Sequence, residues 1–328
     1  MRNTTTSTPP APSGTGRNPA GMPSGVNCKD FLRITDFTAA EIRATIAWAR
    51  AWKAGEVAPR PLASRTAGLI FHKPSLRTRQ SFETGVVKLG GHPMFITDAE
   101  IKLGVRESIH DVAHVMSRYL SLIVIRTFKQ SDVDELARHA TVPVINALTD
   151  AFHPCQVLGD ILTAAEHLGK IDNLRVAFLG DGNNVFHSWA NLAARIPMDL
   201  WLATAPETLP DADIVAAAQA AGLSTISVTH DPAEAVRDAD VIYTDVWASM
   251  GQKDLADERR RLLKPFQVNS SLLRGAKKNA IVMHCLPAER GREITDEVMD
   301  GPQSVVFDEA ENRLWIQGAI MAQLLAGR

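Results

Sequence analysis

Cysteine is scarce in this chain of 328 residues. The three that occur, Cys28, Cys155 and Cys285, lie far apart and form no C-x-x-C pair. Domains held together by disulfides carry many more cysteines, and structural zinc sites place theirs in close pairs. We therefore expect neither a disulfide framework nor a zinc site, and the reducing cytoplasm is the natural setting.

An excess of charge of either sign is also missing, because 35 Lys+Arg stand against 37 Asp+Glu. This balance argues against a general binder of nucleic acid or membrane surfaces, although a local basic pocket remains compatible with it. No apolar run approaches the roughly 18 residues that cross a bilayer. The length and the 45% hydrophobic content fit a soluble protein of two domains.

Aromatic and large aliphatic side chains are almost absent from residues 1–26, which consist mainly of Thr, Pro, Ser, Gly and Ala. Such a segment cannot bury enough apolar surface to offset the entropy of ordering it, so we expect a disordered tail. The tail lacks acids and carries Arg2 and Arg17, as transit peptides do. It has neither an amphipathic apolar stripe nor a signal-peptide core, so targeting is the secondary interpretation.

Strand-like and helical patterns alternate from residue 27 onward. Apolar runs predict strands at 66–71, 93–96, 121–126, 142–145, 174–179, 198–202, 224–228, 240–243 and 280–284. Helical periodicity predicts helices at 38–53, 75–89, 108–119, 133–140, 153–169, from 185 onward and at 312–325, with a polar loop at 98–108. This alternation predicts two α/β domains, 27–160 and 161–311, each with a parallel sheet, and a C-terminal helix 312–328 that packs back on the first.

The stretch Phe71 to Thr84 joins the first strand to its helix. Pro74 ends the strand and Ser75 is a good N-cap, so free backbone N–H groups point outward at the positive end of the helix. Together with Arg77, Thr78 and Arg79, these groups form an anion site of the kind that grips phosphate. A capped helix with solvated arginines fits the same pattern, and this stretch alone does not choose between them.

Other strand ends favour the anion site, because ligands of open α/β sheets bind beyond the carboxyl ends of the strands. Arg126 ends another strand of the first half, and His153 with Gln156 follows the next. These residues are cations and donors without an acid among them. The strand ends of the second half carry instead a carboxylate, amides, a hydroxyl and a thiol, which suit an amine-bearing zwitterion: Asp181, Asn183, Asn184, Asp245, Ser249, His284 and Cys285.

Two alternatives to this interpretation are weak. Gly180 and Gly182 after a strand suggest dinucleotide binding, but the third glycine of G-x-G-x-x-G is replaced by Val185, and no acid closes the following strand. Cys285 beside His284 suggests a covalent nucleophile. Adjacent residues of a strand point to opposite faces, so this pair is a poor catalytic dyad.

Taken together, the motifs resemble the ornithine carbamoyltransferases of the wider aspartate/ornithine transcarbamoylase family. The matching motifs are Ser75-Leu76-Arg77-Thr78-Arg79, His153-Pro154-Cys155-Gln156, Asp181-Gly182-Asn183-Asn184, Asp245-x-x-x-Ser249-Met250-Gly251 and His284-Cys285-Leu286-Pro287. Their order and spacing match from residue 27 to the end. The first two motifs are common to the transcarbamoylases, and the Ser-Met-Gly and His-Cys-Leu-Pro motifs point to ornithine.

The resemblance implies a role for each matching residue. It assigns carbamoyl phosphate to Ser75, Leu76, Arg77, Thr78, Lys102, Arg126, His153, Gln156, Cys285, Leu286 and Arg313. It assigns the ornithine head group to Asn184, Asp245, Ser249 and Met250, and places Arg126, His153, Asp245 and Cys285 at the reacting atoms. Lys102 falls where members of the family reach into the neighbouring subunit's site, and it replaces their more common Gln or His.

The resemblance further implies a carbamoyl-phosphate domain and a Rossmann-like ornithine domain that close over the reactants in a homotrimer. It implies transfer of the carbamoyl group to the δ-amine of L-ornithine, giving L-citrulline and phosphate, with no metal or organic cofactor and no nucleic-acid or membrane partner. Three alternatives stay open. The acceptor could be putrescine or an acylated ornithine, the chain could be a non-catalytic binding relative, or, as the weakest option, it could be an oxidoreductase.

Overall fold

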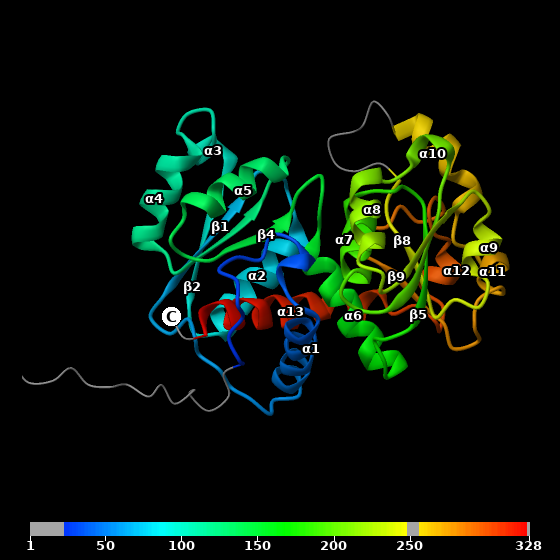
Figure 1. Ribbon diagram of the computed structural model, residues 1–328, viewed down its shortest axis with the longest axis horizontal. Helices are drawn as coiled ribbons and strands as arrows, with labels where there is room; N and C mark the ends of the chain where they lie inside the picture. The colour runs from blue at the N-terminus through cyan, green and yellow to red at the C-terminus, as the bar shows by residue number, and fades with distance from the viewer. Residues whose placement is uncertain (1–22, 248–255, 327–328) are drawn as a thin grey trace, which may run out of the picture.

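The structure is a computed structural model that describes residues 23–247 and 256–326, so the expected tail lies almost wholly outside the described residues. Two lobes stand side by side, each built on one sheet (Figure 1). The first sheet has the order β2-β1-β3-β4 and consists of β1 Thr66–Phe71, β2 His92–Thr97, β3 Leu122–Arg126 and β4 Val144–Leu148. All its neighbouring strands are parallel, as predicted.

The second sheet is also parallel throughout and has the order β7-β6-β5-β8-β9. Its strands are β5 Leu174–Leu179, β6 Met198–Ala203, β7 Thr225–Thr229, β8 Val241–Thr244 and β9 Ile281–His284. The expected fold class of two parallel-sheet α/β units is therefore confirmed.

Helices cover both sheets. In and beside the first lobe lie α1 Ala39–Lys53, α2 Leu76–Lys88, α3 Asp98–Ile101, α4 Ile109–Tyr119, α5 Gln130–His139 and α6 Pro154–Leu168. The second lobe contains α7 Asn184–Ala193, α8 Ala212–Ala220, α9 Pro232–Val236, α10 Ala256–Leu263, α11 Ser270–Leu273 and α12 Asp296–Met299, and α13 Val306–Leu325 follows. Short 3-10 turns occupy Ile34–Asp36, Pro206–Thr208 and Lys264–Phe266. Within the described ranges, no helix combines the length and the apolar character needed to cross a membrane.

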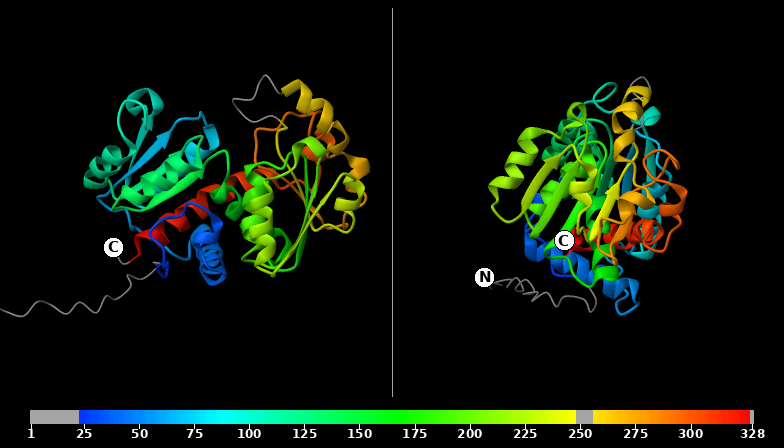
Figure 2. Two further views of the ribbon diagram at one scale, coloured as in Figure 1. Left: turned by 45° about the horizontal axis from the view of Figure 1, so that its top comes forward. Right: turned by 90° about the vertical axis from the view of Figure 1, so that its right-hand side faces the viewer.

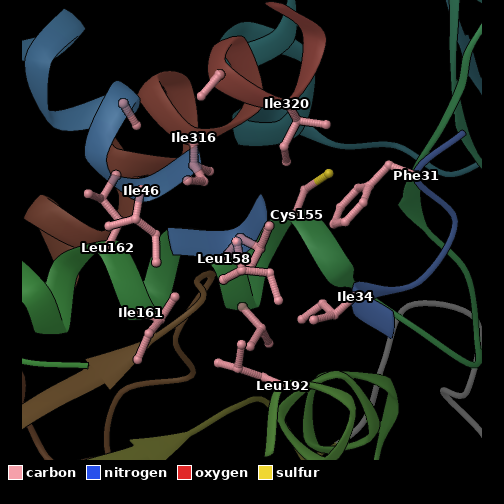
Figure 3. Close-up of a cluster of buried hydrophobic side chains, with 14 of the residues drawn as sticks. Phe31, Ile34, Ile46, Cys155, Leu158, Ile161, Leu162, Leu192, Ile316 and Ile320 are labelled. Atoms are coloured by element: carbon pink, nitrogen blue, oxygen red, sulfur yellow. The ribbon is translucent and has the colours of Figure 1, made fainter. Parts of the chain in front are cut away.

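Two long helices join the lobes. α13 starts beside the second sheet, runs past α6 and packs against α1 and α2 of the first lobe (Figure 2). Apolar side chains from both lobes meet along α6 in one core, where Leu158 and Ile161 lie close to Leu192 of α7 and Ile316 of α13 (Figure 3). The predicted domain boundary at 160/161 falls inside α6, and the division of the chain there remains a prediction.

Several element boundaries predicted from the sequence were wrong, and α5 for example starts at Gln130 rather than at 133. Three of the differences can be explained by contacts in the structure. The C-terminal helix starts at Val306 rather than at 312, because its first turns bury Glu309 in a polar network instead of exposing an acidic loop. The last strand of the first lobe spans Val144–Leu148 rather than 142–145, since Asn146 stays inside the sheet with its side-chain amide bonded to the Leu32 carbonyl. The expected polar loop opens with the short helix α3, whose Thr97 and Glu100 cap each other.

Close packing between α13 and α1 yields a stability prediction. A Cβ added to Gly318 would lie 2.1 Å from Cζ3 of Trp52, whose ring is held between those of Trp48 and Trp315. Overpacking of this kind costs about 1–3 kcal/mol, so Gly318→Ala is expected to lower the free energy of unfolding despite the better helix propensity of alanine.

Gly159→Ala in α6 is the matched control, because the nearest atom to its added Cβ would be 3.6 Å away, an ordinary contact. We expect thermal or urea denaturation to show an unchanged or slightly raised stability for this variant. Equal stabilities of the two variants would contradict the proposed crowding at Trp52.

Candidate active site

A pocket of about 1010 Å³ opens between the lobes beyond the carboxyl ends of both sheets. The start of α2 forms part of its wall, from Ser75 to Thr78. Ser75 is the N-cap, and its hydroxyl accepts a hydrogen bond from the Thr78 backbone N–H at 3.3 Å. The first turn of a helix presents further N–H groups that no helical carbonyl reaches, so this wall suits an anion.

Two buried guanidiniums face the same corner of the pocket. Arg126 at the end of β3 and Arg313 of α13 are 6% and 3% exposed, and both donate to Oγ1 of Thr78, at 3.2 and 2.6 Å. Within the described ranges neither forms an ion pair with a carboxylate, and the Nε atom of each lacks a hydrogen-bond partner. Burial, followed by the charge of Arg313, lowers the pKa of Arg126 to about 10. Two unpaired buried cations predict a bound anion between them.

His153 lies next to these cations and is 4% exposed. Burial is the main cause that holds the pKa of His153 well below the ordinary value of 6.5, and the positive charges of Arg313 and Arg126 add to it. The imidazole is therefore neutral at pH 7. Its backbone N–H donates to the Ser188 hydroxyl at 2.8 Å, and Nδ1 has no partner among the described residues. A neutral imidazole beside two guanidiniums can hydrogen-bond a carbonyl oxygen without adding to the repulsion.

The opposite wall belongs to the second lobe and centres on Asp245. Its carboxylate accepts hydrogen bonds from Asn183 Nδ2 at 2.8 Å, the Val246 N–H at 2.7 Å and Cys285 Sγ at 3.0 Å. Burial, then the neighbouring Asp245, raises the pKa of Cys285 well above the ordinary value of 9.0. The thiol therefore stays protonated at neutral pH, which argues against Cys285 as a nucleophile.

The residues around Cys285 fix its loop. Nδ1 of His284 accepts from the Leu286 N–H at 2.9 Å, and its Nε2 lies 3.2 Å from the buried Glu293. Both ring nitrogens are thus already engaged by groups other than Cys285, so His284 is not placed as the base of a catalytic dyad. Asn184 is the other predicted head-group ligand in the pocket wall, and its Nδ2 donates to the Thr149 carbonyl of the first lobe at 2.6 Å.

The two glycines that suggested a dinucleotide site have another explanation. Gly180 has a φ of 129°, which side-chain-bearing residues rarely adopt, and a Cβ on Gly182 would lie 2.4 Å from the backbone N of Pro210. Backbone geometry and close packing therefore require glycine at both positions.

Comparison with known proteins decides the family. Two family models match the chain, the carbamoyl-P binding domain of aspartate/ornithine carbamoyltransferase at residues 29–166 and the Asp/Orn binding domain at 172–324. The chain belongs to the aspartate/ornithine carbamoyltransferase family. Its expected resemblance to the ornithine carbamoyltransferases is confirmed by the individual relatives.

The ornithine carbamoyltransferase of Syntrophus aciditrophicus is 48% identical over 300 residues, which cover 90% of this chain and 99% of that protein. The chloroplastic ornithine carbamoyltransferase of Pisum sativum is 47% identical over 311 residues, which cover 92% of this chain and 81% of that protein. Among solved structures, the ornithine carbamoyltransferase of Pyrococcus furiosus superimposes with a TM-score of 0.87 at 44% identity, covering 93% of this chain and 98% of that one.

The structure gathers most of the residues that the carbamoyltransferase resemblance singled out. The predicted residues that line the pocket are Ser75, Leu76, Arg77, Thr78, Arg126, His153, Asn184, Asp245, Cys285, Leu286 and Arg313. Ser249 and Met250 lie outside the described residues. Arg79 turns away, since its guanidinium lies 3.6 Å over the Phe95 ring and pairs with Glu83.

Gln156 and Lys102 are not brought to the pocket wall. Gln156 is fully buried behind it, and its Nε2 donates to Asp160 at 2.8 Å and Glu309 at 2.9 Å. Lys102 is exposed at the end of α3, in a left-handed conformation with a φ of 41°. Their assignments to carbamoyl phosphate remain predictions.

Sequence reasoning missed several charged residues of this carbamoyltransferase pocket. Lys73 lies in the wall, 7% exposed and paired with Asp150, and Arg259 of α10 forms an ion pair with Asp181. Burial raises the pKa of Asp181 to about 6, although Arg259 opposes the shift. Lys73 directly precedes Pro74 at a strand end, a signal that could have revealed it. No local signal connects Arg259 to Asp181 across 78 residues.

The carboxyl groups behind Gln156 predict a pH dependence of stability. Burial raises the pKa of Asp160 from 3.8 to about 7, and burial followed by Asp160 raises that of Glu309 well above 4.5. The folded enzyme therefore keeps a proton that the unfolded chain loses near pH 4 to 5. The stability contributed by this pair is fully present below about pH 4 and is lost as the pH rises through 7.

Glu309→Gln removes one of the two carboxyl groups that hold a proton in the folded state. Wild type loses stability as the pH rises, so the stability of the variant relative to wild type is expected to improve. The gain between pH 5 and 8 is at most about 1.4 kcal/mol per pH unit. Urea unfolding at a series of pH values measures it. Glu311→Gln, exposed two residues further along α13, should give a constant offset. A constant offset for Glu309→Gln would exclude the shared proton.

Proposed function

We propose that the chain transfers the carbamoyl group of carbamoyl phosphate to the δ-amine of L-ornithine, giving L-citrulline and phosphate. One observation carries this proposal. A pocket between the two lobes joins a wall that carries the buried guanidiniums of Arg126 and Arg313 with a wall that carries the carboxylate of Asp245. An anionic donor and an amine-bearing acceptor fit these two walls, and the chain belongs to the family whose members bring such reactants together.

On the first wall, the N-terminus of α2 with Ser75, Arg77 and Thr78 binds the phosphate, and Leu76 contributes through its backbone N–H. Arg313, hydrogen-bonded to Thr78, completes this contact. Arg126 and the neutral His153 then lie beside the carbamoyl oxygen. In our proposal, Gln156 and Lys102 join the carbamoyl phosphate only after rearrangement, Lys102 in the site of a neighbouring subunit.

The reaction needs no covalent enzyme intermediate. The lone pair of the neutral δ-amine attacks the carbamoyl carbon, and the carbonyl electrons move onto oxygen as a tetrahedral oxyanion forms. When the oxyanion collapses, the bond from carbon to the phosphate oxygen breaks, and the proton of the attacking amine passes to the departing phosphate. Fixed donors around the oxyanion and the departing phosphate lower the barrier, and holding both reactants in register supplies much of the rest.

On the second wall, Asp245 and Asn184 bind the head group of ornithine, with Ser249 and Met250 from the segment outside the described residues. The thiol of Cys285 and the backbone of Leu286 lie beside the reacting carbon and amine. These residues use no metal and no organic cofactor in the reaction. We further propose a cytoplasmic homotrimer in which subunits share their active sites.

Citrulline formation tests the acceptor. Purified chain with carbamoyl phosphate is offered ornithine, putrescine, N-acetylornithine or aspartate separately, and the carbamoylated product is measured colorimetrically. Product with ornithine alone supports the proposal. Product with another amine keeps the donor half and overturns the acceptor half, whereas no product with any of them favours a binding protein without activity.

A further inference from the structure

Three histidines gather on the surface of the first lobe, away from the pocket. His110 and His114 lie one turn apart on α4, and His139 is the last residue of α5. The ring of His110 lies 4.3 Å from that of His114 and 4.7 Å from that of His139, measured between centroids. One ring nitrogen from each histidine lies within 4.8 Å of those of the other two.

The polar contacts of these rings leave their nitrogens available. Nδ1 of His110 lies 2.9 Å from a carboxylate oxygen of Asp111, and its Nε2 has no protein hydrogen-bond partner in the described part of the chain. No ring nitrogen of His114 or His139 has a protein hydrogen-bond partner within residues 23–247 and 256–326. An imidazole that donates its second N–H to a carboxylate is the usual arrangement of a metal-bound histidine, because the carboxylate fixes the ring and makes its free nitrogen more basic.

We propose that His110, His114 and His139 form a binding site for a zinc-type divalent transition-metal ion, with Asp111 as the carboxylate that orients His110. Bonds of about 2.0–2.1 Å to a tetrahedral ion place the nitrogens about 3.4 Å apart. Small rotations of the rings bring the three nitrogens to that spacing, because all three side chains are at least partly exposed. Water fills the fourth position.

A metal bound at this site would stabilise the first lobe and would not take part in the reaction in the pocket. No residue of α4 or α5 lines the pocket between the lobes. The ion instead links the start of α4 to the end of α5, two helices that already pack against each other. Since the metal binds the folded arrangement and a single unfolded histidine binds it far more weakly, it raises the stability of the protein.

The test uses untagged, chelator-treated protein, titrated with Zn²⁺ by calorimetry and with Co²⁺ by visible absorption. Asp245 and Cys285 of the pocket wall, with the buried His284, also bring ligand atoms together, and Co²⁺ bound there would show a thiolate charge-transfer band. The surface site has nitrogen ligands alone and lacks this band. Wild-type protein is expected to bind Co²⁺ with a tetrahedral spectrum free of it, and Zn²⁺ is expected to raise the melting temperature.

Variants distinguish this site from scattered binding. His114→Gln and His139→Gln are each expected to weaken Zn²⁺ binding by about 100-fold and to abolish the rise in melting temperature. Asp111→Asn is expected to weaken it by about 10-fold, as the loss of an orienting partner does. His92→Gln removes an exposed imidazole of β2 and should change nothing. Unchanged affinity in His114→Gln, or a thiolate band as the only Co²⁺ signal, would overturn the proposal.

Discussion

Alanine at Arg126 is expected to lower kcat by about 10²–10³-fold, the effect of removing one donor from a developing oxyanion. Arg126 lies buried at the end of β3, bonded to Thr78 and without a carboxylate partner in the described part of the chain. Its charge is therefore free for the substrate. Since the oxyanion exists only in the transition state, kcat should fall more than the affinity for carbamoyl phosphate.

Stability gives a second readout of the same substitution. In the absence of substrate, Arg126 and Arg313 repel each other in a buried site, so Arg126→Ala should unfold at an equal or higher temperature than wild type. Arg79→Ala is the control for kinetics, because that guanidinium packs on Phe95 outside the pocket. Near-normal kcat in Arg126→Ala, with a folded protein, would remove Arg126 from its proposed role.

Asparagine at Asp245 is expected to lower kcat/KM for ornithine by about 10²–10³-fold, because truncating one partner of a buried charge pair costs about 2–5 kcal/mol. The carboxylate is 7% exposed and positions both Asn183 and Cys285. Asparagine keeps its shape and removes its charge. The cationic head group of the acceptor loses its counter-charge, whereas the cationic wall that binds carbamoyl phosphate stays intact.

Initial rates with each substrate varied in turn would separate the two halves of the site. We expect the KM for carbamoyl phosphate to change less than about twofold, while ornithine binding weakens strongly. Asp257→Asn provides a matched change, since Asp257 also lines the pocket but is almost fully exposed and pairs with Arg260. Equal losses for both substrates in Asp245→Asn would instead indicate a structural role for the carboxylate.

Features that depend on neighbouring residues were predictable from the sequence. Thr38, Ser75 and Ser108 were each recognised as the start of a helix, and each side chain accepts the hydrogen bond of an N-cap. The strands 66–71 and 174–179 were found at their exact limits, since continuous apolar runs mark strands buried on both faces. The convergence of Arg126 and His153 followed from the rule for strand ends in parallel sheets.

Features that depend on distant partners were not predictable. The assignment of Gln156 to the substrate remains a prediction, but its hydrogen bonds to Asp160 and to Glu309, which is 153 residues away, could not be read from the sequence. The start of α13 was also predicted too late. The acidic residues of its first turn suggest an exposed loop unless the buried partner of Glu309 is known. Arg259 of α10 was missed for the same reason, since its partner Asp181 lies far away in the sequence, just after β5.

The path of α13 determines the order in which the protein can mature during synthesis. Residues 39–88 leave the ribosome early and form α1 and α2, yet the helix that packs against both spans residues 306–325. Until those residues emerge, the apolar faces of α1 and α2 remain open, although the whole second sheet has already been made. We therefore expect that the half translated first finishes folding last, and that nascent chains arrested before residue 306 expose this surface to chaperones.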